Sequence, residues 1–395
     1  MLVCKHLGLS SKSIGHVSRN GIIQEIKRTP LIRQKYAALC QRIQHFRAAL
    51  TVFQDTDSIL FCPNLWMLNI FLVYFLLHQV SPKSIKSFMW EFIKPILTEF
   101  QNPVIYAIPF FLLLILIEAY INYKERTENY LFIDSVASIS MGIVSAFIDV
   151  ITKATAFFVF SWLYLNVGLF SEALSFTLLG WVLLFFLDDF CFYWHHRMSH
   201  QVRVLWAAHV NHHSSTYYNL STALRQSWSE LIYKYIFYLI LPIIGFHPIM
   251  ILTQISISLI YQFCMHTKRI DRLPRIIELL FNTPSHHRVH HASNIMYLDR
   301  NHAGILIIWD RMFGTFQEED PAEPVIYGIT TDIKTYNPLR IASHEFVSIG
   351  KDLKRASSLR DKLGYLFMPP GWSHDGNDQR SDTLRAAMQQ KASKE

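Results

Sequence analysis

The segment WVLLFFLDDFCFYWHHRMSH (181–200) joins a long apolar run directly to three histidines. The apolar run begins at residue 176 and continues to residue 194. A membrane-spanning helix needs about 20 mostly apolar residues, so the segment predicts a membrane helix that ends in histidines. Residues four apart share a helix face, which places His196 and His200 side by side.

The composition of the whole chain favours a membrane protein. Of its 395 residues, 51% are hydrophobic and only 17% are charged, whereas a soluble domain carries about 25% charged residues. The net charge of +7 suits anionic lipid headgroups, and the high apolar content argues against a nucleic-acid partner. The five cysteines are scattered and include no CxxC pair, so we expect neither a disulfide framework nor a zinc finger.

Four further apolar runs predict membrane helices, at residues 59–80, 102–121, 135–170 and 231–265. The third run contains Asp149 and Lys153, which predicts either one long helix with an ion pair or two helices that meet near Lys153. The fourth predicts a hairpin of two helices, broken at LPIIGFHP (241–248). The predicted fold class is therefore all-α, a polytopic membrane helical bundle.

Two more histidine clusters follow the first, HVNHH (209–213) and HRVHH (287–291). In each, the second and third histidines lie three and four residues after the first, so neighbouring faces of one helix carry all three. Imidazole is a common ligand for iron, zinc, copper and nickel. Eight such rings exceed what one ion with open positions needs, and they suit two ions. Burying them without a metal would leave polar groups unsatisfied.

Other histidine chemistries fit the sequence less well. HExxH is absent, which disfavours a metalloprotease. A bis-histidine haem protein needs one histidine on each of two facing helices, rather than two clusters of three histidines. A non-enzymatic membrane protein that binds metal stays as an alternative. The isolated His78, His247 and His302 are interpreted as packing residues. Asp189 lies seven residues before His196, on nearly the same face, and is expected to accept the free N–H of a ligating histidine.

The clusters resemble those of the membrane fatty acid hydroxylase and sterol desaturase superfamily of non-haem di-iron enzymes. The blocks WAAHVNHHSSTYYNLSTALRQS (206–227), NTPSHHRVHH (282–291) and AGILIIWDRMFGTF (303–316) are similar to a branch that hydroxylates ether lipids with tetrahydrobiopterin. The resemblance implies two iron ions at the cytosolic ends of the helices. The implied ligands are His196, His200, His209, His212, His213, His287, His290 and His291, together with His266 of FCMHTK.

The resemblance also implies a reaction and a place in the cell. O₂ and tetrahydrobiopterin would hydroxylate the carbon next to the ether oxygen of an alkylglycerol lipid, giving a fatty aldehyde and a glycerol derivative. Asn219, Arg225 and Gln226 are the candidate pterin-binding residues, and His195 and His286 are expected to pack beside the metal ligands. The expected location is the endoplasmic reticulum membrane, with several spans. The alternative is a sterol or fatty acyl hydroxylase or desaturase that takes electrons from cytochrome b5, because the histidine clusters alone do not separate these enzymes.

Three regions are expected along the chain. Residues 1–58 form a basic N-terminal arm, placed in the cytosol by the positive-inside tendency. Residues 59–345 form the catalytic domain, with EEDPAEP (318–324) as a surface loop. Residues 346–395 form a polar C-terminal tail, and the last thirty residues are predicted to be disordered.

Overall fold

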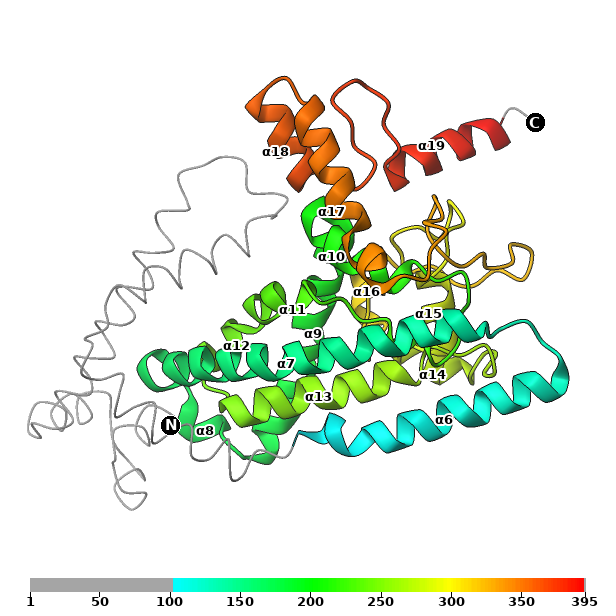
Figure 1. The fold of residues 1–395 in the computed structure, drawn as a ribbon. Coiled ribbons are helices and arrows are strands. Elements are labelled where there is room, and N and C mark those ends of the chain that lie inside the picture. The colour runs from blue at the N-terminus through cyan, green and yellow to red at the C-terminus, as the bar shows by residue number, and fades with distance from the viewer. Residues whose placement is uncertain (1–101, 394–395) are drawn as a thin grey trace, which may run out of the picture. The chain divides into compact units, whose positions relative to one another are not determined.

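The computed structural model describes residues 102–393, and within this range the chain is helical and forms no strand (Figure 1). Within this range, Ala292 and Tyr327 form an isolated antiparallel β-bridge. The predicted all-α class is therefore confirmed. The predicted N-terminal arm (1–58) and the apolar run at 59–80 lie outside the described residues.

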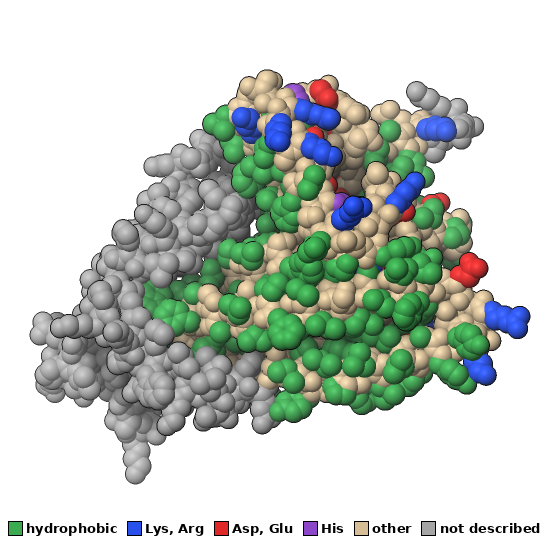
Figure 2. Space-filling view, viewed as in Figure 1, with side chains coloured by type: hydrophobic (Ala, Val, Ile, Leu, Met, Phe, Trp, Pro, Cys, Tyr) green, Lys and Arg blue, Asp and Glu red, His purple; other side chains and the backbone are tan. Residues whose placement is uncertain are grey.

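Three described helices are long and apolar enough to cross a membrane: α6 (Pro103–Glu125), α7 (Phe132–Val167) and α9 (Leu178–Gln201). Asn102 caps the start of α6 by accepting from the backbone N–H of Val104 at 3.1 Å. Figure 2 shows hydrophobic side chains over the face on which α6 and α7 lie. Such a face suits lipid, because a soluble protein rarely exposes so wide an apolar surface.

α7 is a single unbroken helix of 36 residues, which decides between the two predictions for 135–170. Lys153 Nζ lies 2.8 Å from Asp149 Oδ2, four residues earlier on the same face. Tyr235 donates its hydroxyl hydrogen to the other carboxylate oxygen at 3.0 Å. The two charges in this span therefore neutralise each other, which an apolar environment requires.

The predicted hairpin at 231–265 is correct for its second arm alone. That arm is α13 (Pro248–Phe263), with Pro248 at its first position. The first arm is broken into short turns, which are α11 (Glu230–Tyr233), η3 (Lys234–Tyr238) and α12 (Ile240–Ile244). Gly245 ends the arm with a φ of 120°, a left-handed conformation that favours glycine.

α13 lies between α6 and α7 (Figure 1) and also packs on α9. The short helices α8 (Ser171–Leu174) and α12 complete this apolar core. Its fully buried members include Phe160, Leu184, Leu241, Phe246, Met250 and Ile251. The packing fixes the end of α9, where the first histidine cluster begins.

Short helices and loops follow the membrane helices and carry the other histidines. α10 (Arg203–His213) begins two residues after α9 ends, and α15 (Pro284–His290) begins with a proline at its first turn. The remaining short elements are η2 (Thr222–Leu224), α14 (Arg275–Leu280) and α16 (Ile308–Met312). The loop predicted at 318–324 is confirmed, since no helix or strand covers it.

The C-terminal region is helical, so the predicted disorder of the last thirty residues is wrong for those that the structure describes. The helices are α17 (Pro338–Arg355), α18 (Leu359–Phe367) and α19 (Ser381–Ala392). Arg203 of α10 holds α17 through Glu345 at 2.8 Å and Asp352 at 2.7 Å. Within the last thirty residues, Ser381 donates to Asp299 and Arg385 donates to the backbone oxygen of Leu298, both at 2.6 Å, so contacts with a distant part of the chain order a polar sequence.

Candidate metal centre

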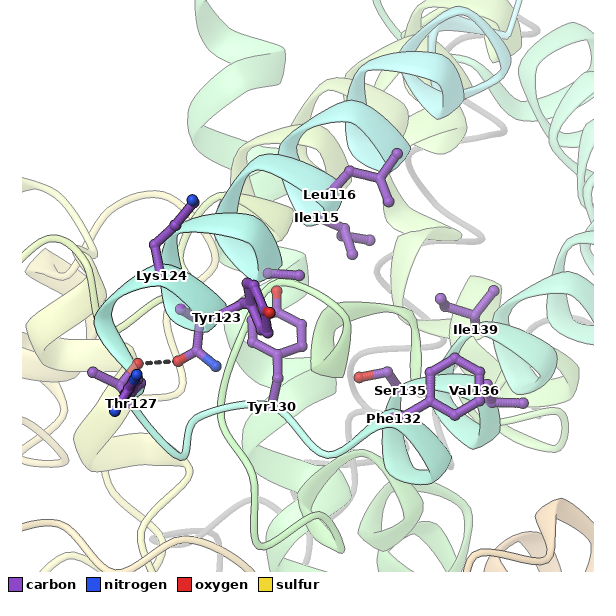
Figure 3. Close-up of a pocket in the computed structure, with 13 residues that line it drawn as sticks. Ile115, Leu116, Tyr123, Lys124, Thr127, Tyr130, Phe132, Ser135, Val136 and Ile139 are labelled. Carbon is purple, nitrogen blue, oxygen red and sulfur yellow. Dashed lines mark hydrogen bonds between the residues drawn. The ribbon is translucent and has the colours of Figure 1, made fainter.

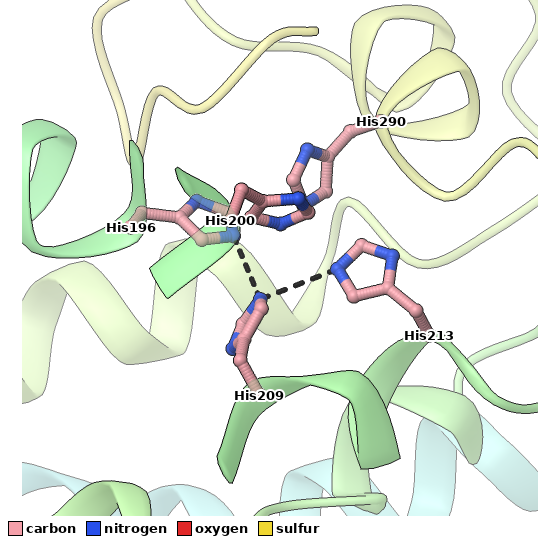
Figure 4. A group of neighbouring side chains, drawn as sticks. All are labelled: His196, His200, His209, His213 and His290. Carbon is pink, nitrogen blue, oxygen red and sulfur yellow. Dashed lines mark hydrogen bonds between the residues drawn. The ribbon is translucent and has the colours of Figure 1, made fainter. Parts of the chain in front are cut away.

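Nine histidines gather into two neighbouring groups, and every one of them is buried. The first group, shown in Figure 4, holds His196, His200, His209, His213 and His290. The second holds His212, His266, His287 and His291. Within each group, one nitrogen from every ring lies within 4.8 Å of all the others. All nine predicted ligands are therefore brought together, including His266 from beyond the end of α13.

Ring nitrogens face each other at the centre of each group. In the first, His209 Nε2 lies 3.0 Å from His196 Nε2 and 3.2 Å from His213 Nε2. Adjacent imidazoles on one divalent ion lie about 3 Å apart when metal–nitrogen bonds are about 2.1 Å. The spacing therefore matches that of neighbouring ligands on one metal ion.

The second group has the same spacing. His266 Nε2 lies 3.1 Å from the Nε2 atoms of both His212 and His287. Its Nδ1 donates to the backbone oxygen of Gln262 at 2.9 Å, which fixes the ring from outside. The two groups therefore share the inward convergence of their ring nitrogens.

The outer nitrogens of the first group also have fixed partners. His196 Nδ1 donates to the backbone oxygen of His302 at 2.8 Å, and His290 Nδ1 donates to that of Arg300 at 2.9 Å. Metal-binding histidines usually give their other N–H to such an oxygen, which sets the tautomer and the ring orientation.

Two carboxylates complete this outer ring. Glu230 Oε2 accepts from His209 Nδ1 at 3.1 Å, and its other oxygen lies 3.3 Å from His195 Nε2. Asp299 Oδ1 lies 3.1 Å from His200 Nδ1. Sequence reasoning predicted neither contact, because the two residues lie 21 and 99 positions from the histidines they contact and no local spacing marks them; Asp299 was expected only to be a scaffold residue.

These hydrogen bonds test whether the residues fit a metal. A neutral imidazole has one N–H, so a ring that donates from Nδ1 presents a lone pair at Nε2. His196 and His209 thus point two lone pairs at each other across 3.0 Å. His290 Nε2 and His291 Nε2 are buried without a hydrogen-bond partner. A cation between the rings would satisfy these atoms, so the donor set fits a metal ion.

Burial favours the neutral, metal-binding form of several of these imidazoles. Desolvation, followed by the neighbouring rings, holds the pKa of His212, His213 and His291 well below 6.5. Desolvation lowers the pKa of His266 to about 4. Burial alone would raise the pKa of Glu230, but His209 and His195 lower it to about 2, so this carboxylate stays an acceptor.

Three buried histidines lie beside the groups and belong to neither of them. His195 contacts Glu230, and His286 Nε2 lies 2.9 Å from Glu278 Oε2. His302 supplies its backbone oxygen to His196. The packing roles predicted for these residues agree with these contacts.

Asp189 has a different partner from the one predicted. One oxygen accepts from the backbone N–H of Ile305 at 2.7 Å, and the other accepts from Leu306 N–H and Trp309 Nε1, both at 2.9 Å. The expectation that it accepts from a ligating histidine is therefore wrong. The helix spacing suggested a histidine partner for Asp189, but the loop 303–309 supplies these three N–H donors instead.

The three predicted pterin-binding residues lie in different surroundings. Arg225 is 1% exposed, forms an ion pair with Asp134, and donates to Ser138 and Ser214 at 3.1 and 3.2 Å. Asn219 Nδ2 donates to the backbone oxygen of Asn129 at 2.7 Å. Gln226 lines a cavity beside the histidines. Internal contacts account for the burial of the first two, and a pterin role for all three stays a prediction.

A cavity of about 350 Å³, called here the inner cavity, extends from the membrane helices to both histidine groups. Its apolar wall comes from α6, α7 and α13, and includes Ile108, Ile143 and Leu259. Its polar end includes His196 and His209 of the first group, and His212, His266 and His287 of the second. A long alkyl chain in this space would lie in apolar surroundings with one end beside the imidazoles.

The fold and this centre define a class of membrane protein with a histidine-rich metal site. Residues 181–315 match the model of the fatty acid hydroxylase family, and this range contains all nine grouped histidines. This part of the chain is therefore similar to the fatty acid hydroxylase family.

Within that class, the chain is similar to alkylglycerol monooxygenase from several animals. The Homo sapiens protein is 38% identical over 278 residues, which cover 70% of this chain and 61% of the relative. The Danio rerio protein is 37% identical, over 68% of this chain and 59% of the relative. The chain thus spans about three fifths of the length of these relatives.

A more distant similarity extends to another lipid oxidase. Lathosterol oxidase from Homo sapiens is 26% identical over 172 residues, which cover 42% of this chain and 54% of the relative. No solved structure matches the chain significantly.

Proposed function

We propose that this protein is a membrane monooxygenase that cleaves the ether bond of alkylglycerol lipids, using two iron ions, O₂ and tetrahydrobiopterin. The observation that carries the proposal is the pair of all-imidazole groups at the polar end of an apolar cavity. The similarity to alkylglycerol monooxygenases supports the choice of substrate.

The reaction requires an oxidant that side chains do not supply. Bound iron would activate O₂ for attack on an unreactive C–H bond. One oxygen atom enters the C–H bond next to the ether oxygen, and the other leaves as water with two electrons and two protons from the reductant. The resulting hemiacetal loses its C–O bond to the glycerol, which gives a fatty aldehyde and a free glycerol hydroxyl.

The residues of the chain would hold the two ions, orient the ligating rings and shield the alkyl chain from water. The groups of five and four imidazoles would each hold one ion, and Glu230 and Asp299 fix the orientation of His209 and His200. The apolar wall of the cavity keeps water from the alkyl chain. Neutral nitrogen ligands without a carboxylate or thiolate suit ferrous iron.

Reconstitution with different reductants tests the proposal. The full chain, loaded with iron in lipid nanodiscs, receives an alkylglycerol, O₂ and tetrahydrobiopterin, and fatty aldehyde is measured. We expect aldehyde with tetrahydrobiopterin alone. Aldehyde or hydroxylated product formed with cytochrome b5 and its reductase, and none with the pterin, would instead identify the sterol or fatty acyl oxidase.

Location in the endoplasmic reticulum is part of the same proposal. The three apolar helices α6, α7 and α9 support a protein with several spans, and this membrane is the one that the family resemblance of the sequence implies. Co-fractionation of the tagged full chain with an endoplasmic reticulum marker is the expected result, and a plasma membrane profile would contradict it.

A further inference from the structure

A groove of about 850 Å³ lies between the end of α6 and the start of α7, next to the inner cavity (Figure 3). Ile115 and Leu116 line it from α6, and Val136 and Ile139 line it from α7. The close-up shows Tyr123 and Tyr130 near each other in the space between the two helices. This groove is separate from the histidine centre, and the proposed reaction gives it no role.

The groove and the inner cavity adjoin each other, and together we call them the slot. Ile139 of α7 lines both of them. Along α6, the lining residues recur every three or four positions, at Ile108, Phe111, Ile115 and Ala119, so one helix face borders both spaces.

α7 contributes a matching face. Its lining residues include Phe132, Val136 and Ile139 in the outer groove, and Gly142 and Ala146 in the inner cavity. The stretch 132–149 covers about 26 Å at 1.5 Å per residue, which approaches the roughly 30 Å thickness of a bilayer's hydrocarbon core.

The packing of α6 leaves this slot open. α6 packs along α13, and Phe111 stacks on Phe263 with ring centroids 4.0 Å apart. Buried Glu118 fixes the end of α6, because it accepts from Tyr130 Oη at 2.5 Å and from Leu220 N–H at 2.9 Å. The α6 side of the slot is thus held in place by these contacts.

The two ends of the slot differ in chemistry. The outer groove has exposed Lys124 and Arg126 at its rim, with Tyr123 beside them, a combination typical of the lipid–water interface. Its side is open to lipid, since Leu116 is 67% exposed and Phe132 is 82% exposed. The inner cavity has an apolar wall from α6, α7 and α13, and its polar lining includes the histidines together with Glu230 and Lys234.

We propose that the slot between α6 and α7 is a lateral lipid portal, in which the outer groove holds the polar headgroup while the alkyl chain occupies the inner cavity. In a lipid placed this way, the junction between headgroup and alkyl chain would lie near Ile139, where the inner cavity with its histidines begins. The ligand class is an amphiphile with one long alkyl chain and a small glycerol-based headgroup. The identity of the lipid rests on the proposed function, whereas the route between α6 and α7 does not.

Photolabelling tests occupancy without turnover. An alkylglycerol with a diazirine on the first carbons of its chain is added to the full chain in nanodiscs without reductant, and labelled peptides are identified by mass spectrometry. We expect labels within 112–126 and 132–143, which excess unlabelled alkylglycerol removes. Labels confined to the exposed start of α9 at 178–186, with no competition, would overturn the portal.

A reversible block tests the route. Ala119 lines the groove, so Ala119→Cys, modified with a bulky methanethiosulfonate, should lower both photolabelling and aldehyde formation at least tenfold. Dithiothreitol should restore both. The control is Leu113→Cys, because Leu113 is 51% exposed on the same helix and lines neither space.

The readouts separate this inference from the proposed function. Competed labelling in the slot without aldehyde under any condition would reject the monooxygenase and keep the portal. Normal labelling and turnover with Ala119→Cys fully modified would reject the portal and keep the monooxygenase.

Discussion

His212 and His290 each stand three residues after the first histidine of their cluster, and each belongs to the opposite group from that first histidine. His209 and His213 share the first group, while His287 and His291 share the second. A helix turns by about 100° per residue, so residue i+4 lies about 40° to one side of residue i and residue i+3 about 60° to the other side. Each of these two clusters therefore serves both groups.

Removing His212 or His290 should disrupt one group without unfolding the protein. We expect His212→Ala and His290→Ala each to insert into membranes, to lower the iron content from about two ions toward one per chain, and to lose at least a hundredfold in turnover. Metal analysis and aldehyde formation measure these effects. His344→Ala is the matched control, since His344 lies on α17 and belongs to neither group. Two bound ions and normal turnover in either variant would contradict the ligand assignment.

Glu230 should tune the first group through His209. Glu230→Gln keeps the shape of the side chain but removes the charge that accepts from His209 Nδ1. Loss of such an outer partner typically lowers metal affinity 10–100-fold, so we expect a weakening of this size in competition with a chelator. Glu128→Gln, in the exposed loop between α6 and α7, should leave the affinity unchanged. Equal affinities in the two variants would assign Glu230 to packing alone.

At the scale of elements, one buried ion pair fastens η2 to α7. Arg225 directly follows η2, and its guanidinium pairs with Asp134 in the first turn of α7. Removing one partner of a buried pair leaves an uncompensated charge, which costs about 3–5 kcal/mol. Arg225→Met should therefore lower the unfolding free energy by about this amount.

The double variant Arg225→Met/Asp134→Leu distinguishes a structural role from the predicted pterin role. It should recover most of the stability in a thermal unfolding assay, because no charge remains unpaired. If it also turns over with an unchanged dependence on tetrahydrobiopterin, Arg225 has a structural role only. A stable double variant with intact iron and a raised pterin requirement would support the predicted cofactor role.

For the whole molecule, the histidine centre and the C-terminal helices should face the same side of the membrane. α17 is held against α10 by Arg203, and α10 carries the second histidine cluster. By the positive-inside tendency, we expect this side to be the cytosol, where tetrahydrobiopterin would also bind.

Labelling of an exposed position checks this topology. Ser357 is exposed between α17 and α18, so Ser357→Cys should react with an impermeant maleimide in sealed microsomes without detergent. The protein without this substitution gives the background labelling of the native cysteines. Labelling that requires detergent would place the C-terminal helices, and with them the histidine centre, on the lumenal side.

Local sequence determined much of this protein. Apolar runs of sufficient length predicted α6, α7 and α9, because the hydrocarbon thickness of a membrane sets the length of a spanning helix. Histidine spacing selected eight of the nine grouped residues, and the resemblance added His266. These features are local, since helix periodicity and ligand chemistry act within a few residues.

Only the tertiary structure decided how those residues are used. Contacts between distant segments divided the histidine clusters between two groups. They also placed Glu230 beside His209 and Asp299 beside His200. Asp189 instead accepts from the loop 303–309. Contacts between distant segments also ordered the polar C-terminal region and left a slot between α6 and α7. Such outcomes depend on which side chains meet after the helices pack, and no periodicity within a single segment encodes a partner a hundred residues away.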